Sequence, residues 1–187
     1  NLARAAHLIS DFKQVTVDHT SDQRRVFDLA DVTNELLNML QPQLRRSGLQ
    51  VQRFLEPGVS CDSSPGRYGR VLTNLVMNAL TPAFENHTTG TLSIYAGPLG
   101  EDQLELRVVD DGAGMTDEVR HRVFDPFFTT KMGRGGTGLG MHIVHTIVTQ
   151  VLTGQISVTS APGEGTTVRV CIPRVVPGAP QTDGASV

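Results

Sequence analysis

The chain has 187 residues, enough for one folded domain with a substantial hydrophobic core. Its apolar content of 39% and charged content of 19% are ordinary for a soluble globular protein. With 16 Lys and Arg against 19 Asp and Glu, the net charge is −3, and the lack of an overall basic field excludes nucleic acid as an expected partner.

The first 27 residues are expected to lie outside the main fold. Residues 1–15 predict a truncated helix, because apolar side chains recur at helical spacing with no N-cap before them (Leu2, Ala5, Ile9 and Phe12). We expect the packing partner of this helix to lie upstream. Residues 16–27 are polar and predict a linker.

The next segment predicts a helix followed by a strand. Asp28 is a candidate N-cap for a helix with one apolar stripe, and Gly48 suits the position just after its end. Pro42 inside the stripe predicts a kink or a broken turn. Residues 49–55 alternate as a strand does.

A second long helix and four further strands complete the predicted fold. Ser64 and Pro65 suit the N-cap and first position of a helix that Pro82 ends. The buried-helix pattern at 141–151 is broken by His142, His145 and Gln150, so it predicts a core helix rather than a membrane span. The four strands are predicted at 91–97, 103–110, 154–160 and 166–173.

These elements predict an α+β domain over residues 28–173. Strands that follow one another through short turns pair antiparallel, so we expect a mixed, mostly antiparallel sheet with helices on one face. Residues 174–187, rich in Pro, Gly, Ala and Ser, predict a disordered tail. Cys61 and Cys171 are far apart without metal-ligand spacing, which indicates reduced thiols in a cytosolic protein.

Two asparagines mark the second long helix. Asn74 and Asn78 are four residues apart, so their side chains point the same way on one turn. Buried carboxamides are costly unless they are hydrogen-bonded or hold a ligand, and a neutral oxygen ligand suits Mg²⁺. The alternative is a pair of ordinary surface asparagines.

Two glycine turns flank an aromatic-proline stretch, Phe124 to Phe128. The first turn follows Asp110, whose carboxylate at the end of a buried strand is able to accept from an adenine amino group. The alternative is a simple turn aspartate. Gly112 and Gly114 would let the backbone pass close to a flat base.

The second glycine turn opens the core helix. Backbone N–H groups of Gly138, Leu139 and Gly140 at a helix N-terminus form a site for phosphate. Gly133, Gly135 and Gly138 also match the dinucleotide-binding spacing, but a polar loop precedes them and no acidic residue follows about 20 positions on. We therefore favour phosphate binding without a Rossmann unit.

Residues 62–173 resemble the ATP-binding catalytic domain of sensor histidine kinases, which shares a superfamily with gyrase, Hsp90 and MutL. The resemblance implies a two-layer α/β sandwich, the Bergerat ATP-binding fold. Five motifs in the family's order carry it: NLVMNA at 74–79, DDGAGM at 110–115, VFDPFFTTK at 123–131, GTGLGM at 136–141 and GEGTT at 163–167.

The resemblance implies roles at the adenine and metal ends of an ATP site. Asn78 would coordinate Mg²⁺, and Asn74 would lie beside the phosphates. Asp110 would accept from the adenine amino group, with Thr166 supporting it through water. Gly112 and Gly114 would shape the adenine pocket.

It also implies a phosphate end. Residues 125–137 would form a lid, with Phe127 and Phe128 packing its hinge and Lys131 reaching the γ-phosphate. Thr137, Gly138, Leu139 and Gly140 would hold the triphosphate.

Two departures from the family pattern are visible. Thr81 and Pro82 stand where a basic or aromatic residue often follows the second asparagine, so charge compensation would fall to Lys131 and Arg134. None of the six histidines has the phosphoacceptor pattern around it (His7, His19, His87, His121, His142 and His145). Residues 1–15 resemble the second helix of the hairpin that carries that histidine.

The resemblance therefore implies transfer of the ATP γ-phosphate to a histidine outside this chain, for relay to the receiver domain of a response regulator. A homodimeric full-length protein is expected, with a cytoplasmic catalytic domain and with or without an anchor in the bacterial inner membrane. One alternative is an ATPase of the gyrase or Hsp90 kind; another is a non-catalytic, nucleotide-dependent interaction module.

Overall fold

The computed structural model describes residues 23–80, 90–130 and 137–177. Its main sheet has five strands in the order β2-β4-β5-β7-β6. β2 pairs parallel with β4, and the other neighbours pair antiparallel, which confirms the predicted mixed sheet. The strands are β2 (Gln50–Leu55), β4 (Thr91–Leu99), β5 (Gln103–Asp110), β6 (Gln155–Ser160) and β7 (Thr166–Pro173).

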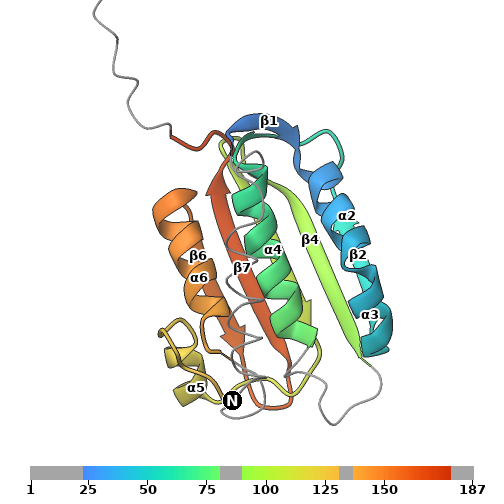
Figure 1. Cartoon of the computed structure of the whole chain (residues 1–187), viewed down its shortest axis with the longest axis vertical. Coiled ribbons are helices and arrows are strands. Elements are labelled where there is room, and N and C mark those ends of the chain that lie inside the picture. The colour runs from blue at the N-terminus through green and yellow to red at the C-terminus, as the bar shows by residue number, and fades with distance from the viewer. Residues whose placement is uncertain (1–22, 81–89, 131–136, 178–187) are drawn as a thin grey trace, which may run out of the picture.

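The helices form a second layer over one face of this sheet. Figure 1 shows α2, α4 and α6 side by side in front of the strands. This arrangement confirms the expected two-layer α+β sandwich. The helices are α2 (Leu29–Met39), α3 (Gln41–Ser47), α4 (Pro65–Leu80), α5 (Asp117–Arg122) and α6 (Gly140–Thr146), which continues into the π-helix η1 (Ile147–Val151).

Local signals explain where the first helices begin and end. The Asp28 side chain accepts the Asp31 N–H at 3.0 Å and caps α2. Pro42 lies in the first turn of α3, and the break at Leu40 separates the two helices as the proline predicted. Gly48 ends α3 with a φ of 73°, the left-handed conformation that glycine adopts most easily.

The core lies between the sheet and the helices. Leu72, Leu75 and Val76 on α4 are fully or almost fully buried. On β5, alternate side chains at Leu104, Leu106 and Val108 face them, while the intervening residues are only partly buried or exposed. Burying this continuous apolar layer is the main source of stability for the fold.

A two-stranded sheet at the edge of the domain differs from the prediction. β1 (Arg25–Asp28) pairs antiparallel with β3 (Ser60–Ser63), so the segment predicted as linker contributes a strand from Arg25 onward. Each strand has four residues, too few for a polar-apolar alternation to be visible in the sequence. The described structure does not cover residues 1–22, where the predicted truncated helix and most of the linker lie.

The C-terminal segment also differs from its prediction as far as Pro177. The backbone N–H of Asp62 donates to the Arg174 carbonyl at 2.8 Å, and the Val176 N–H donates back to the Asp62 carbonyl at 3.0 Å. The Asp62 carboxylate pairs with Arg24 at 2.8 Å. Through Asp62, β3 thus contacts residues near both ends of the described chain. The composition of the tail, rich in small and polar residues, did not predict this pairing. Residues 178–187 lie outside the described ranges.

The predicted core helix at 141–151 is present, but its second half has π geometry. Val144, Val148 and Leu152 are completely buried, as the core interpretation requires. Within the described ranges, no helix combines the length and the hydropathy that crossing a bilayer would need. Nothing in the sequence marks where the α-helix changes to π.

Candidate functional site

The two asparagines of α4 occupy different environments. The Nδ2 of Asn74 donates to the Arg70 carbonyl at 2.8 Å, which fixes the amide so that its oxygen is the free group. The Nδ2 of Asn78 is buried and has no hydrogen-bond partner within the described residues. A buried amide without a partner is costly, and a bound ligand is the usual way to satisfy it.

The start of α6 lies against both asparagines. A Cβ added to Gly140 would lie 3.3 Å from Asn74 Oδ1, 3.5 Å from Asn78 Oδ1 and 3.6 Å from Asn78 Nδ2. Only glycine leaves this space open. The structure therefore brings together the helix turn and the glycine turn that the sequence placed at the metal and phosphate end.

The second glycine turn is built on the aromatic-proline stretch. Gly138 has a φ of 70°, and a Cβ there would lie 2.5 Å from the carbonyl carbon of Phe127. Thr137 accepts the Leu139 N–H at 3.4 Å. No side chain caps α6 at Leu139. The Leu139 N–H is thus directed to the Thr137 hydroxyl, and the position of the turn is fixed by packing.

The aromatic-proline stretch packs on α6 through Phe124. The Phe124 carbonyl lies 3.1 Å from Nδ1 of His142, and the Phe124 ring lies 5.1 Å from that of His145. Arg122 lies over the Phe128 ring at 4.4 Å. Phe127 differs, because it is 70% exposed with a φ of 63°. Its ring therefore does not pack the hinge.

Lys131 and the rest of 131–136 lie outside the described residues, as do Thr81 and Pro82 in the stretch 81–89. The roles expected for Lys131, for Arg134 and for a lid over 125–137 stay predictions.

Asp110 is the last residue of β5 and precedes the first glycine turn. Its side chain is only 7% exposed, and its Oδ1 accepts the Gly112 N–H at 3.0 Å. Burial raises the pKa of this carboxyl, although backbone hydrogen bonds from Gly112 and Thr166 act in the opposite direction. A buried carboxylate that meets only backbone donors keeps acceptor capacity for a ligand.

Three polar side chains form one row on the helix-facing side of the sheet. Asp110 lies directly opposite Thr166 on β7, and Thr166 lies directly opposite Ser160 on β6. Ser160 Oγ accepts the Met115 N–H at 2.9 Å, donates to the Gly165 carbonyl at 2.8 Å and lies 3.0 Å from Thr166 Oγ1. The sequence analysis missed Ser160. The sequence feature that could have indicated Ser160 is a serine at a position where the alternation of the strand predicts an inward-facing side chain.

Glycine at 114 and 165 is required by close approach of two backbone turns. A Cβ on Gly114 would lie 1.9 Å from the Ala161 carbonyl oxygen, and one on Gly165 would lie 2.0 Å from the Asp110 carbonyl oxygen. Both have a positive φ, of 66° and 75°. Packing against the β6–β7 turn is therefore sufficient to require glycine at position 114. Its expected role in shaping an adenine pocket stays a prediction.

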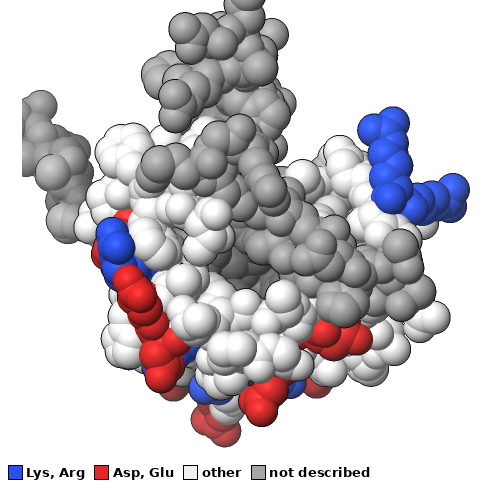
Figure 2. All heavy atoms as spheres, turned by 90° about the horizontal axis from the view of Figure 1, so that it is seen from below, with Lys and Arg blue, Asp and Glu red and all other residues white. Residues whose placement is uncertain are grey.

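The described surface around these elements carries its charge at the margin. Figure 2 shows the lower end of Figure 1, where, among the described residues, acidic and basic side chains lie toward the edge and uncharged atoms lie nearer the middle. Within the described residues no group of three His, Cys, Asp or Glu side chains could hold a metal ion. A metal here would depend on neutral oxygen ligands and on the ligand's own phosphates.

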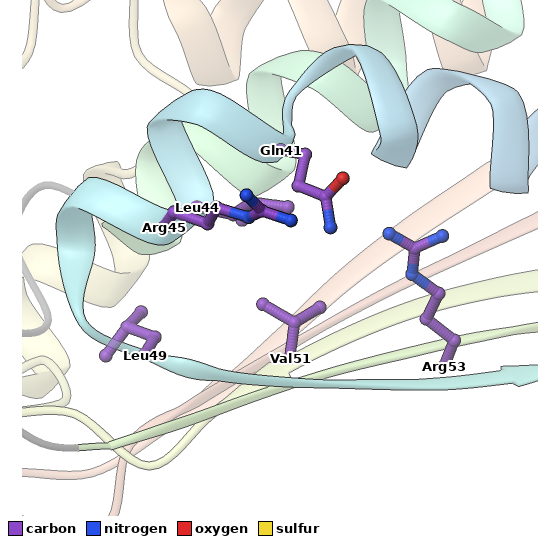
Figure 3. A pocket seen from close by; sticks show the side chains of 6 residues that line it. All are labelled: Gln41, Leu44, Arg45, Leu49, Val51 and Arg53. Atoms are coloured by element: carbon purple, nitrogen blue, oxygen red, sulfur yellow. The ribbon is translucent and has the colours of Figure 1, made fainter.

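A separate open groove of about 340 Å³ lies between α3 and β2. Figure 3 shows its side chains, with the guanidinium groups of Arg45 and Arg53 on its walls. None of the residues that the sequence assigned to a nucleotide lines it. The lining residues are Gln41, Leu44, Arg45, Leu49, Val51 and Arg53.

Residues 64–176 match the model of one protein family, described as "Histidine kinase-, DNA gyrase B-, and HSP90-like ATPase". The chain belongs to this family.

Sensor histidine kinases are among its similar proteins. The chain is 32% identical to the sensor histidine kinase RcsC of Escherichia coli strain K12 over 184 residues, which cover 94% of this chain and 18% of RcsC. It is 33% identical to the sensor histidine kinase AruS of Pseudomonas aeruginosa over 150 residues, covering 75% and 15%. The chain therefore spans less than a fifth of the length of these relatives.

Solved structures of the family share the fold. The catalytic domain of histidine kinase ThkA has a TM-score of 0.72 at 25% identity, covering 82% of this chain and 97% of that domain. Full-length ShkA in complex with AMPPNP has a TM-score of 0.75 at 21% identity, covering 93% and 37%. As a member of this ATPase family, the chain has the fold of a histidine kinase catalytic domain and the motifs of a nucleotide-binding protein.

The position of Gly140 gives a first test of the family's site in this chain. A Gly140→Ala variant should bind ATP roughly ten-fold more weakly, because its methyl group would press on Asn74 Oδ1 and occupy the space beside the Asn78 amide. Its thermal stability should change little, since alanine suits a helix better than glycine. Calorimetric titration with ATP measures the first quantity and circular dichroism melting the second. Gly69→Ala is the matched control, because a Cβ there meets only Leu36 side-chain atoms; an equal loss of affinity in both variants would contradict the assignment.

Proposed function

We propose that this chain is the ATP-binding catalytic part of a sensor histidine kinase and binds ATP together with Mg²⁺. The position of Gly140 next to Asn74 and Asn78 carries the proposal, because a Cβ there would lie within 3.6 Å of both amides, and the candidate metal ligand thus adjoins the candidate phosphate turn. Asp110 supplies a buried acceptor at the far end. The site thus has an adenine end and a phosphate end, as an extended nucleotide requires.

The metal end fits Mg²⁺ by the chemistry of its donors. Asn78 would hold the ion through its side-chain oxygen, and the phosphates and water would complete the coordination. The Nδ2 of Asn78, which has no partner among the described residues, would then donate to a phosphate oxygen. Bound Mg²⁺ supplies neutralisation of charge on the transferring phosphoryl group.

The phosphate end would rely on the backbone N–H groups of residues 137–140. This segment leads into α6. The glycines and the adjacent Thr137 and Leu139 would surround the phosphates, with Lys131 as a further cation.

At the adenine end, Asp110 would accept from the 6-amino group, because a carboxylate in a buried position recognises a donor strongly. Gly112 orients this carboxylate through its N–H. Thr166, directly opposite on β7, would be the second polar contact.

The proposed reaction is phosphoryl transfer to an imidazole. A histidine nitrogen from another segment attacks the γ-phosphorus, the bond between that phosphorus and the β–γ bridging oxygen breaks, and ADP leaves. The imidazole N–H proton passes to solvent. Positioning and charge neutralisation do most of the work in such transfers.

Asn74 favours this reaction over hydrolysis. Activation of a water molecule needs a general base, and a carboxamide cannot accept the proton. The amide of Asn74 is moreover fixed by its bond to Arg70 with the oxygen free. A gyrase-like or Hsp90-like ATPase is therefore the weaker alternative, and a non-catalytic interaction module the other.

Further proposals concern the full-length protein. A ThkA structure was solved in complex with the response regulator TrrA, and we propose a response-regulator receiver domain as the downstream partner here also. We propose that the acceptor histidine lies on a dimerising hairpin, so that the intact protein is a homodimer. Because ATP is a cytoplasmic substrate, we propose that the domain works in the cytoplasm, whether or not the intact protein has a membrane anchor.

Transfer in trans tests the reaction. The 187-residue chain is incubated with γ-labelled ATP, Mg²⁺ and a longer form of the protein that includes the segment upstream of residue 1 and carries Asn78→Ala, so that its own site cannot bind ATP. We expect acid-labile label on the longer form only when the shorter chain is present. Without the longer form the shorter chain should acquire no stable label.

Two other outcomes would favour the alternatives. Release of inorganic phosphate without labelling would indicate an ATPase. Tight ATP binding without labelling or release would indicate a non-catalytic module. A chain carrying Asn78→Ala serves as the inactive control for both measurements.

A further inference from the structure

We infer that Ser160, which lies behind the adenine end, sets the direction of the Thr166 hydroxyl and thereby makes this end of the site an all-acceptor surface. The inference rests on the proposed function, since it concerns how that site selects its base. Ser160 is a positioning residue in this account and does not touch the nucleotide.

The hydrogen-bond count at Ser160 carries the argument. A serine hydroxyl has one proton to donate and two lone pairs to accept. Its proton goes to the Gly165 carbonyl at 2.8 Å, and one lone pair takes the Met115 N–H at 2.9 Å. Only one accepting position is left. The 3.0 Å contact with Thr166 must therefore be a bond in which Thr166 donates.

This assignment decides what Thr166 offers to a ligand. Since its one proton is directed to Ser160, its oxygen presents only lone pairs on its other side. Its neighbour in the row, Asp110, presents carboxylate oxygens, and two backbone N–H groups already occupy part of their accepting capacity. Both side chains then accept and neither donates.

An all-acceptor surface selects the substituent at position 6 of a purine. The 6-amino group of adenine donates, either directly or through a water molecule whose two protons point to the protein. The 6-oxo group of hypoxanthine or guanine accepts, and would leave acceptors facing one another. A site built to bond a donor rejects an analogue lacking it, because buried polar groups are left unpaired.

The Ser160 hydroxyl also fixes the turns that bear this surface. It connects the glycine turn at Met115 with the β6–β7 turn at Gly165, and the Gly163 N–H donates to the Ala113 carbonyl at 2.8 Å beside it. Loss of the hydroxyl would weaken this connection and free the Thr166 proton together. The two effects are separable because only the second depends on the identity of the base.

The test compares ATP with ITP, which differs from it at position 6 of the base and in the N1 proton that accompanies the 6-oxo group. Calorimetric titration in Mg²⁺ should show that the unaltered chain prefers ATP. In Ser160→Ala the ratio of ATP to ITP affinity should fall roughly ten-fold, the size of one lost hydrogen-bond preference. Ser160→Thr keeps a hydroxyl and should restore the ratio, and Ser157→Ala, an exposed serine on the same strand, should leave it unchanged.

A double-mutant cycle makes the mechanism specific. If Ser160 acts through Thr166, then Ser160→Ala should no longer change the ratio in a chain that already carries Thr166→Val. If Ser160→Ala does not fold, as judged by circular dichroism, Ser160→Cys provides a similar volume with a weak donor and acceptor, and should lower the ratio in the same way.

The failures are distinguishable. An unaltered chain that binds neither nucleotide would overturn the proposed function. A chain that binds ATP without preference over ITP, or a Ser160→Ala variant that loses ATP and ITP affinity equally, would overturn the role of Ser160 and leave the ATP site standing.

Discussion

An Asn78→Ala variant should bind ATP in the presence of Mg²⁺ about 100-fold more weakly than the unaltered chain, a loss of about 2.7 kcal/mol. The substitution removes both the proposed metal ligand and the buried donor that has no partner within the described residues. Calorimetric titration at fixed Mg²⁺ measures the effect. Chelation of the metal should weaken binding to the unaltered chain far more than to the variant.

The control for this substitution is Asn38→Ala. Asn38 lies on α2, where its side chain accepts from Arg53 at 2.8 Å, remote from the proposed site. Its removal should leave ATP affinity unchanged. Adenosine, which has no phosphates, should bind the Asn78→Ala variant as it binds the unaltered chain. Unchanged affinity for ATP with Mg²⁺ in Asn78→Ala would refute the metal assignment.

An Asp110→Asn variant should lose adenine recognition while the fold becomes no less stable. ATP and adenosine should both bind roughly 10- to 100-fold more weakly, because the charged acceptor is replaced by an amide. The free energy of unfolding, in contrast to the affinity, should not fall. Burial raises the pKa of Asp110 in the folded state, so folding favours its protonated form and the ionised group opposes folding at neutral pH.

The stability contribution of Asp110 therefore increases as the pH falls through its raised pKa, and in Asp110→Asn this part of the pH dependence should vanish. Denaturant unfolding at several pH values measures it, with Asp102→Asn, at an exposed carboxylate in the β4–β5 turn, as the control. A variant that is both less stable than the unaltered chain at neutral pH and unimpaired in adenosine binding would contradict the assignment of this end of the site.

The two variants together separate the two ends of the site. Asn78→Ala should spare adenosine and affect ATP, whereas Asp110→Asn should affect both. A structural collapse in either variant would remove both ligands and also lower the melting temperature, so the pattern distinguishes loss of a contact from loss of the fold.

Much of the fold could be predicted because its signals are local. The cap at Asp28, the break at Pro42 and the left-handed turn at Gly48 act within a few residues, and each lies where the sequence placed it. The long strands were visible from their alternation. The asparagine pair was visible because helix geometry alone places the two side chains on one turn.

The features that sequence analysis missed depend on residues distant in the chain. β1 and β3 are short strands far apart in sequence, and neither carries an alternation of its own. Ser160 acquires its importance only when β6, β7 and the turn after β5 come together. The packing role of Gly114 likewise depends on Ala161. Such contacts have no periodic trace in a single sequence.

The close approach of the turn after Asp110 and the β6–β7 turn has a consequence for how this chain is able to vary. Because Gly114 meets the Ala161 carbonyl and Gly165 meets that of Asp110, the hairpin between Ser160 and Thr166 is held against the turn after β5 at Ala161 and Gly165, whereas a Cβ at its tip, Gly163, would meet nothing within 4 Å. The hairpin around Gly100, where a Cβ would meet nothing within 4 Å, has no such constraint. Length variation among homologues, and fluorescent labels or fusion partners added by experimenters, should therefore be tolerated at the hairpin around Gly100 and excluded from the positions of Ala161 and Gly165 in the other hairpin.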